Sequence, residues 1–269
     1  MRTPVIGTYG HGTENDFVII FDPSEQIHLT AEIVARICNR SAGIGADGVI
    51  RITHPEGKWF MDYRNADGSL AEMCGNGIRV MARYLVTRGH QSEGLFSINT
   101  RDGAKFLRVP MDGDISVNMG QVSDEGDIVM VLVNGSSYSA RHISIGNPHA
   151  VAFLEDLDSL GSLDLPPVVE PASVYPEGVN LEFVEIQSLD TLIMRVHERG
   201  SGETRSCGTG TCAVALAASI HTRGQLPARW IIKPPGGTLI VDIDGHSNAT
   251  LTGPALLLAD HDLSRFFTA

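Results

Sequence analysis

Basic residues are scarce in this chain. Its 269 residues include 20 lysines and arginines against 32 aspartates and glutamates, which gives a formal net charge of −12. The arginines are scattered along the chain, so no basic stripe is available for phosphate backbones or anionic lipids. We therefore expect neither a nucleic-acid partner nor a membrane partner.

Long apolar segments are also missing. The longest apolar run, Ala213 to Ile220, is far too short to span a bilayer, and no long apolar segment follows the single basic residue of the opening MRTPVIGTYGHG. The chain is long enough to bury a substantial core, in one large domain or in two of ordinary size. We expect a soluble, cytoplasmic protein.

Cysteines are few, and their spacing excludes two common uses. The four cysteines, at positions 38, 74, 207 and 212, form no C-x-x-C pair and have no histidine at zinc-finger spacing. A disulfide framework and a metal site are therefore not expected. Cys38 follows helical apolar spacing and Cys212 falls inside a predicted helix, so both are interpreted as packed side chains.

Lysines and nucleotide-binding loops are equally sparse. The three lysines, Lys58, Lys105 and Lys233, lie in no phosphate-loop setting, which argues against a pyridoxal phosphate enzyme. GIGADG (43–48) spells G-x-G-x-x-G, but a predicted helix precedes it and a strand follows, the reverse of the dinucleotide-binding order. CGTGT lacks the G-K-[ST] ending of a P-loop. We expect no cofactor.

Short β-rich runs separated by glycine and proline turns make up most of the chain. They predict strands at 17–21, 48–52, 59–64, 192–198 and 238–244. Helical spacing predicts helices at about 30–40, 75–88 and 208–222. The fold class expected from this pattern is α+β, with mostly non-local sheet pairing.

The chain also repeats itself. An offset of 133 aligns FMDYRNADGSLAEMCGNGIRVMA with IMRVHERGSGETRSCGTGTCAVA without a gap, so that Cys74 falls on Cys207. Upstream, Asn15 lies 132 residues before Asn147, and each asparagine precedes a strand-like run. Two agreeing landmarks favour a duplication, which implies two similar lobes related by a pseudo-twofold axis, with a cleft between them.

Each repeat places a C-G-x-G segment at the start of a predicted helix. Backbone N–H groups and the helix dipole at such a position lower the pKa of a thiol and attract a carboxylate. Two thiols facing one ligand, Cys74 and Cys207, suit removal of a proton from one face of the carbon next to a carboxylate and its return to the other face. A thiol hydrolase would leave the second cysteine unexplained.

At these residues the sequence resembles the diaminopimelate epimerase family. The segments that carry the resemblance follow one order along nearly the whole chain: NADGSLAEMCGNGIR, SIGNPHAV, PEGVN, ERGSGETRSCGTGTC, PPGG and LTGPA. The resemblance implies a cofactor-independent isomerase that interconverts LL- and meso-2,6-diaminopimelate in lysine and cell-wall biosynthesis. It also implies a homodimer.

The family's fold implies two pseudo-symmetric lobes, each with a central helix wrapped by mostly antiparallel sheet, and an active site in the cleft between them. The N-terminal lobe would comprise residues 1–118 and 254–269 and carry Cys74. The C-terminal lobe would comprise residues 119–253 and carry Cys207.

The resemblance also implies roles for single residues. Cys74 and Cys207 match the catalytic pair, and His149 and Glu198 match groups that tune the thiols. The matched substrate-binding residues are Asn15, Asn65, Gly75, Asn76, Asn147, Asn180, Glu198, Arg199, Gly208 and Thr209. Among these, Glu198 and Arg199 match the pair that reads the distal end of the substrate.

Two positions depart from the family's pattern. Glu14 stands where the family usually has a glycine before the asparagine, and Gly48 stands where some members have a glutamine that reaches the substrate. Both leave substrate preference open. The alternatives are a cofactor-independent racemase of another amino acid in the same superfamily and a non-catalytic small-molecule binding protein on the same scaffold.

Overall fold

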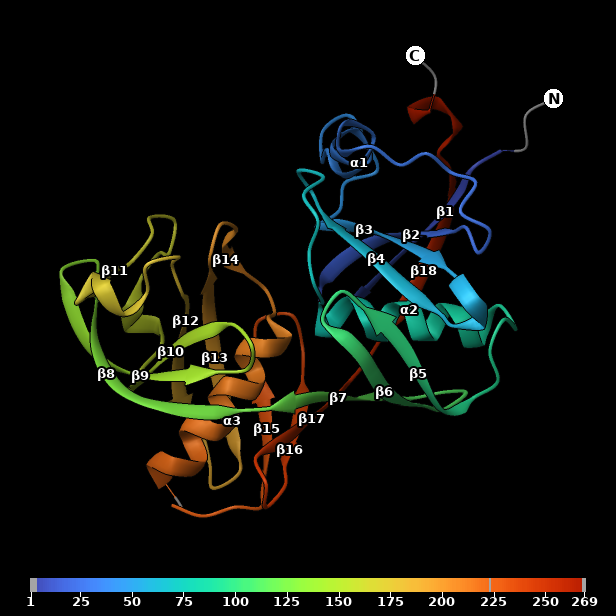
Figure 1. Cartoon of the computed structure of the whole chain (residues 1–269). Coiled ribbons are helices and arrows are strands. Elements are labelled where there is room, and N and C mark those ends of the chain that lie inside the picture. Colours follow the sequence, from blue (N-terminus) through green and yellow to red (C-terminus); the bar gives the residue numbers. More distant parts are fainter. Residues whose placement is uncertain (1–3, 223, 268–269) are drawn as a thin grey trace. The chain divides into compact units, whose positions relative to one another are not determined.

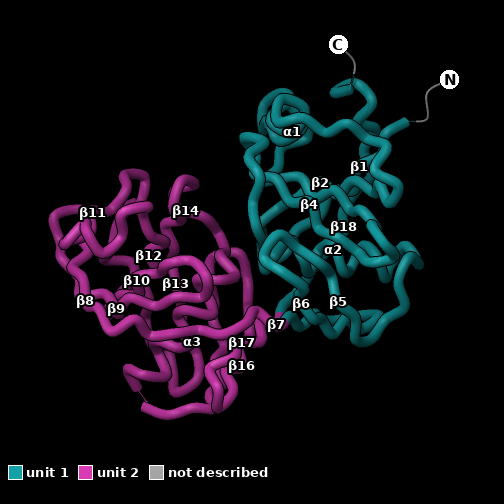
Figure 2. Tube along the Cα trace, viewed as in Figure 1, with its two compact units in different colours: residues 1–117, 253–269 teal, residues 118–252 magenta. Residues whose placement is uncertain are grey.

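The computed structural model describes residues 4–222 and 224–267; residues 1–3 and 268–269, which the sequence assigns to the first lobe, lie outside the described residues. Over the described residues the chain forms three α-helices and eighteen strands (Figure 1). The α+β class expected from the sequence is confirmed. The chain divides into two compact units, residues 1–117 with 253–269 (unit 1) and residues 118–252 (unit 2) (Figure 2).

Unit 1 contains two of the expected helices, α1 (Ala31–Cys38) and α2 (Gly75–Thr87). Its strands are β1 (Ile6–Gly12), β2 (Asn15–Phe21), β3 (Gly48–Thr53), β4 (Phe60–Asn65), β5 (Gly94–Thr100), β6 (Gly103–Val109) and β18 (Leu256–Asp262), and β7 (Ile115–Gln121) begins in it. A 3₁₀ turn, Pro55–Gly57, follows β3, and another, Ser264–Phe266, follows β18.

Strand pairing in unit 1 brings the two ends of the chain together. β18 pairs antiparallel with β1, and β1 pairs antiparallel with β2. β2 and β3 are parallel, β3 and β4 antiparallel, β4 and β5 parallel, and β5, β6 and β7 follow in antiparallel order.

Unit 2 contains the third expected helix, α3 (Gly208–Thr222). Its strands are β8 (Ser123–Val133), β9 (Ser136–Ser144), β10 (Pro148–Leu154), β11 (Val168–Glu170), β12 (Asn180–Ile186), β13 (Thr191–Glu198), β14 (Gly202–Thr204), β15 (Ala228–Lys233), β16 (Leu239–Ile243) and β17 (Asn248–Gly253). Two 3₁₀ turns lie between β10 and β12, Asp158–Leu160 and Ala172–Val174.

The pairings of unit 2 repeat those of unit 1. β8, β9 and β10 pair antiparallel, β10 and β12 are parallel, and β12 and β13 are antiparallel. β13 and β15 are parallel, and β15, β16 and β17 continue antiparallel. The same succession of pairings, in which α2 follows β4 and α3 follows β13 and the short β14, is the structural counterpart of the repeat in the sequence.

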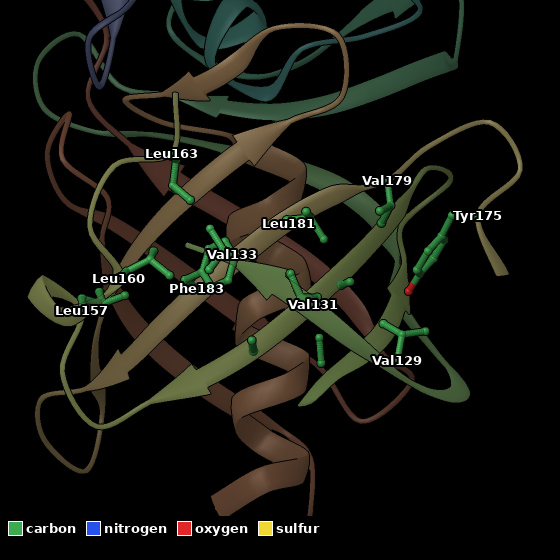
Figure 3. Close-up of a cluster of buried hydrophobic side chains, with 13 residues drawn as sticks. Val129, Val131, Val133, Leu157, Leu160, Leu163, Tyr175, Val179, Leu181 and Phe183 are labelled. Carbon is green, nitrogen blue, oxygen red and sulfur yellow. The ribbon is translucent and has the colours of Figure 1, made fainter. Parts of the chain in front are cut away.

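In each unit a helix and an apolar cluster cover opposite faces of the sheet. On β12, Leu181 and Phe183 point into the buried cluster that includes Val131 of β8 (Figure 3). Successive side chains of a strand alternate between faces, so Glu182 points to the other face, where it meets Gly210 of α3. The side chains on the α3 face of the sheet therefore lie beside the start of the helix that follows Cys207.

Unit 1 has the same layering. Val18 and Ile20 of β2 pack with Val34 and Ile37 of α1 in a second apolar cluster. Residues of the opposite parity, including Phe17, face Gly77 of α2. α1 begins at an N-cap threonine, Thr30, whose side chain accepts a hydrogen bond from the backbone N–H of Ile33 at 3.3 Å.

The turn before Asn15 is a two-residue hairpin loop between β1 and β2. Both loop residues adopt positive φ, 50° at Thr13 and 60° at Glu14. Such turns match the twist of the two strands, but side chains other than glycine are strained in them. The family departure noted at Glu14 therefore falls on a strained backbone position beside a candidate site residue.

Candidate active site

Cys74 caps helix α2. It has extended backbone angles, φ −139° and ψ 120°, and its sulfur accepts a hydrogen bond from the backbone N–H of Gly77 at 3.4 Å. The N-cap position is normally filled by serine, threonine, asparagine or aspartate, whose oxygen accepts this bond. The sulfur therefore occupies a site built for an anion or an acceptor.

Asn15 and Asn76 lie against this thiol. The Cys74 sulfur donates to Asn15 Oδ1 at 3.5 Å, and Asn76 Nδ2 donates to the same oxygen at 3.2 Å. Arg79, which is fully buried, donates to Asn76 Oδ1 at 3.0 Å and to the carbonyl oxygen of Gly75 at 3.0 Å. The structure thus brings four sequence-predicted residues together, and Arg79 fixes two of them.

Behind Asn15 lies a charged network. Asn15 Nδ2 donates to Asp47 Oδ2 at 2.7 Å, and Arg40 Nη2 lies 2.7 Å from Asp47 Oδ1. Arg40 also binds both oxygens of Asp16 at 3.0 Å. Asp47 is therefore held in place by an arginine that also clamps the residue after Asn15.

Asn65 lies apart from this cluster in its hydrogen bonding. Its side-chain nitrogen donates to Ser69 Oγ at 3.0 Å, within the turn that follows β4. A role for Asn65 in substrate binding stays a prediction.

Cys207 lies at the start of α3, just as Cys74 lies at the start of α2. The backbone N–H of Gly210 donates to the Cys207 sulfur at 3.4 Å, and Thr209 Oγ1 lies 3.5 Å from it. Burial, followed by the carboxylates of Glu198 and Glu182, raises the pKa of the Cys207 thiol well above its usual value, while the bonds from Thr209 and Gly210 lower it. The second thiol is buried and the first is partly exposed.

Glu198 is the carboxylate with the largest effect on the pKa of this thiol. It accepts hydrogen bonds from Cys207 and from Thr204 Oγ1. Burial raises the pKa of Glu198, and these two hydrogen bonds only partly oppose that rise. A carboxyl group in contact with a thiol can exchange a proton with it.

His149 connects to the same thiol through side chains. His149 Nδ1 lies 2.7 Å from Glu182 Oε1, and both side chains are fully buried. His149 Nε2 lies 3.2 Å from Asn147 Oδ1, and Asn147 Nδ2 donates to Thr209 Oγ1 at 3.4 Å. Glu182 was not among the residues singled out from the sequence.

Asn180 and Arg199 form a second, separate pair. Asn180 Oδ1 accepts from the backbone N–H of Arg199 at 3.0 Å, and Asn180 Nδ2 donates to the carbonyl oxygen of Pro148 at 3.3 Å. The Arg199 guanidinium donates to the carbonyl oxygen of Glu177 at 3.0 Å. Contact of either residue with a substrate stays a prediction.

Sequence reasoning missed Asp47, Arg79 and Glu182. In retrospect, sequence signals point to Glu182 and Arg79. Glu182 interrupts the apolar run NLEFV of a buried strand, and Arg79 lies one turn beyond Gly75 on a helix whose neighbouring residues are buried. Asp47 carries no such signal, because its contact with Asn15 depends on how strands β2 and β3 pair.

Solved structures share this fold at low sequence identity. A phenazine biosynthesis protein of the PhzF family from Bacillus anthracis superposes with a TM-score of 0.70 at 16% identity, covering 97% of this chain and 99% of its own. A hydroxyproline epimerase from Agrobacterium vitis, with bound trans-4-hydroxy-L-proline, has a TM-score of 0.70 at 14% identity, covering 96% of this chain and 91% of its own. These likenesses define the class of fold, one shared by amino-acid epimerases and PhzF-family proteins.

Sequence comparisons narrow the class to one family. The family model described as diaminopimelate epimerase matches residues 7–124 and 141–258. A diaminopimelate epimerase from Streptomyces coelicolor is 46% identical, covering 97% of this chain and 96% of its own length. One from Thermobifida fusca is 43% identical, covering 94% and 96%. The chain belongs to the diaminopimelate epimerase family, and so to the isomerases.

Proposed function

We propose that this chain is a diaminopimelate epimerase that interconverts LL- and meso-2,6-diaminopimelate at the α-carbon, without a cofactor, for lysine and cell-wall precursor synthesis. One observation carries the proposal: each unit holds a cysteine at the start of a helix, with a helix N–H on its sulfur, at Cys74 and at Cys207. The names of the relatives supply the substrate.

The proposed reaction is a proton transfer between two sulfurs. One cysteine, as thiolate, takes the α-proton; the C–H bond breaks, and its electron pair delocalises into the adjacent carboxylate. The other cysteine, as thiol, delivers its proton to the opposite face of the carbon. Cys74 and Cys207 then have exchanged protonation states, so the next turnover in the same direction requires proton exchange with solvent.

The substrate carboxylate is proposed to lie at the helix starts. The first N–H groups of a helix have no intrahelical acceptor, and the dipole there favours negative charge. In α2 these groups belong to Gly75 and Asn76, and in α3 to Gly208 and Thr209. They would stabilise the charge that develops on the carboxylate as the α-proton leaves.

The remaining candidates take supporting roles in the proposal. Glu198 and His149 would tune the thiol of Cys207, which agrees with the contacts of Glu198 to Cys207 and of His149 to Asn147. Binding of the substrate's polar groups is proposed for Asn15, Asn65, Asn147, Asn180, Glu198 and Arg199. Arg199 can bind a distal carboxylate with two hydrogen bonds.

The test is a chiral chromatographic assay of LL-diaminopimelate with reduced, purified protein. The proposal expects the meso isomer to form, and expects no racemisation of proline, hydroxyproline or histidine. Racemisation of one of these in place of diaminopimelate would assign the chain to another racemase activity. Calorimetric binding of diaminopimelate without turnover would make it a binding protein.

A homodimer in the cytoplasm is part of the same proposal. Size-exclusion chromatography with light scattering tests the dimer. A mass of one 28.9 kDa chain at assay concentration would contradict it. No described helix is long and apolar enough to cross a membrane.

A further inference from the structure

The two units differ at one buried pair of side chains. In unit 1, β2 and β3 place Phe17 opposite Gly48, and two residues further Ile19 lies opposite Ile50. In unit 2, β10 and β12 place His149 opposite Asn180, and two residues further Val151 lies opposite Glu182. Phe17 and Ile50 of one unit therefore occupy the places of His149 and Glu182 in the other.

Unit 1 forms without an ion pair at this position. Phe17 and Ile50 are fully buried beside Gly77, just as His149 and Glu182 are fully buried in unit 2. Replacing a buried ion pair by apolar side chains of similar size is often neutral or stabilising, because the charges lose their hydration. A hydrogen-bonded histidine–glutamate pair where the duplicate has apolar groups therefore points to a role beyond stability.

Gly210 leaves room for this pair. A Cβ atom at Gly210 would lie 2.4 Å from Glu182 Oε1, well inside van der Waals contact. The second carboxylate oxygen, Glu182 Oε2, is buried and has no hydrogen-bond partner among residues 4–222 and 224–267. The hydrogen bond with His149 Nδ1 is thus the contact that compensates for the burial of this carboxyl group.

The direction of the hydrogen bonds follows from these contacts. A carboxylate only accepts, so Nδ1 of His149 carries hydrogen. The other ring nitrogen faces Asn147 Oδ1, which also accepts, so the ring donates at both nitrogens. Asn147 then turns its NH₂ group to Thr209 Oγ1, and the hydroxyl hydrogen of Thr209 is left for the Cys207 sulfur.

At Cys74 the direction is reversed. Asn15 Nδ2 donates to the carboxylate of Asp47, which only accepts. The amide oxygen of Asn15 therefore faces the Cys74 sulfur and accepts from it. Asn15 thus presents its amide oxygen to Cys74, whereas Asn147, at the equivalent place of the repeat, presents its amide nitrogen to Thr209, which contacts Cys207.

We propose that Glu182 and Asp47 are positioning residues that set these opposite amide orientations. Glu182 holds His149 doubly protonated and so directs hydrogen-bond donors toward Cys207, while Asp47 directs an acceptor toward Cys74. The connection to catalysis rests on the proposed epimerase function; the orientations themselves do not.

At Cys207 the hydrogen-bond donors and the nearby carboxylates shift the pKa of the thiol in opposite directions. The groups that face its sulfur are Glu198 on β13, Glu182 on β12, and Thr209 and Gly210 at the start of α3. The carboxylates raise the pKa of this thiol and the two donors lower it. Glu182→Gln removes one of these carboxylates, but it also removes the acceptor that fixes Nδ1 of His149 as a donor. The proposal expects the lost donor toward Cys207 to outweigh the lost negative charge.

The first test is the protonation state of His149, measured by long-range ¹H–¹⁵N NMR of ¹⁵N-histidine-labelled protein at neutral pH. His149→Gln assigns its signals. The wild-type ring is expected to carry hydrogen on both nitrogens, and Glu182→Gln is expected to leave hydrogen on one. A wild-type ring with hydrogen on only one nitrogen would overturn the proposal.

The second test is the pH midpoint of iodoacetamide alkylation, followed at each cysteine by mass spectrometry. Glu182→Gln should raise the Cys207 midpoint by about one pH unit, the worth of one hydrogen bond, and leave Cys74 unchanged. Asp47→Asn should lower the Cys74 midpoint and leave Cys207 unchanged. Glu185→Gln, the same change on the same strand, should alter neither; an unchanged or lowered Cys207 midpoint in Glu182→Gln contradicts the proposal.

A double variant guards against a folding defect. His149→Phe with Glu182→Ile copies the pair of unit 1, and we expect it to fold, with a raised Cys207 midpoint. Loss of cooperative thermal unfolding in this variant would show that the fold needs the ion pair and would overturn the proposal. None of these measurements uses the epimerase activity, so failure of the proposed function would be seen separately.

Discussion

The backbone N–H of Gly210 donates to the sulfur of Cys207 at 3.4 Å. Gly77 and Cys74 repeat this relation at 3.4 Å in the other unit. In both places the donor is the third residue beyond the cysteine, so the thiol fills the role of a helix cap. The chemistry proposed for the chain depends on these two caps, since each supplies an N–H group to a sulfur that must become an anion.

Cysteine substitutions test the need for both thiols. We expect Cys74→Ala and Cys207→Ala each to lower epimerase turnover by about 10³-fold or more, because each removes the acid or base for one face of the carbon. Cys38→Ala is the matched control. Cys38 is buried in an apolar cluster, and burial raises its pKa to about 12, so turnover per folded enzyme should not change. Near-normal turnover in either of the first two variants would contradict a two-base reaction.

Gly210→Ala tests the space reserved for Glu182. The added Cβ would lie 2.4 Å from Glu182 Oε1, a contact that the buried carboxylate cannot relieve without losing its place beside His149. We expect the free energy of unfolding in urea to fall by about 1–3 kcal/mol. Gly245→Ala, where an added Cβ meets nothing within 4 Å, should change it by less than about 0.5 kcal/mol. Equal effects of the two variants would argue against crowding at Gly210.

Asp62 predicts a dependence of stability on pH. It is 2% exposed and forms ion pairs with Arg51 at 2.9 Å, Arg64 at 3.3 Å and Arg101. Burial acts to raise its pKa, but the three arginines more than offset burial and hold the pKa below the usual 3.8. The stabilisation is therefore complete above that value and is lost as the pH falls through the lowered folded-state pKa.

The measurement compares urea unfolding of wild type and Asp62→Asn across pH. We expect the variant to be less stable by about 3 kcal/mol at neutral pH, because it leaves three arginines without their carboxylate. The difference should narrow below about pH 4. Asp112→Asn, at an exposed carboxylate, should show no such difference. A difference that stayed constant down to pH 2 would refute the account of Asp62.

Glu14→Gly tests strain beside Asn15. Glu14 has φ 60°, a conformation that costs a residue with a Cβ about 1 kcal/mol and costs glycine little. Glycine also has more conformational entropy in the unfolded chain, which offsets part of this gain. We therefore expect thermal unfolding to show the variant more stable by about 0.5 kcal/mol. Glu125→Gly, in strand β8 at a residue without positive φ, should instead lose stability. Destabilisation by Glu14→Gly would show that the glutamate side chain compensates for its backbone.

The sequence was a good guide to local structure. The three helices fall where apolar spacing and the C-G-x-G segments predict them, since a helix start depends on residues close in the chain. The repeat offset also predicted that Asn15 and Asn147 would take equivalent places, and Asn15 begins strand β2 while Asn147 directly precedes strand β10. These features follow from periodicity and from local turn chemistry.

What the sequence did not provide depends on pairing between distant segments. Glu182 reaches His149 only because β10 and β12 run parallel in one particular register, and a shift of one residue would turn it to the other face. Asp47 reaches Asn15 for the same kind of reason. The side-chain hydrogen bond of Asn65 is local instead, because its amide donates to Ser69 within the same turn.

The central claim is that the two thiols epimerise diaminopimelate, and ¹H NMR of LL-diaminopimelate with the reduced protein in deuterium oxide tests it most directly. With no cofactor or metal added, we expect the meso isomer to appear with deuterium at the inverted carbon, while early in the reaction the remaining LL isomer keeps its α-protons. An unchanged spectrum from folded, reduced protein would contradict the proposed activity. Deuterium entering the LL isomer without formation of the meso isomer would contradict the assignment of one thiol to each face.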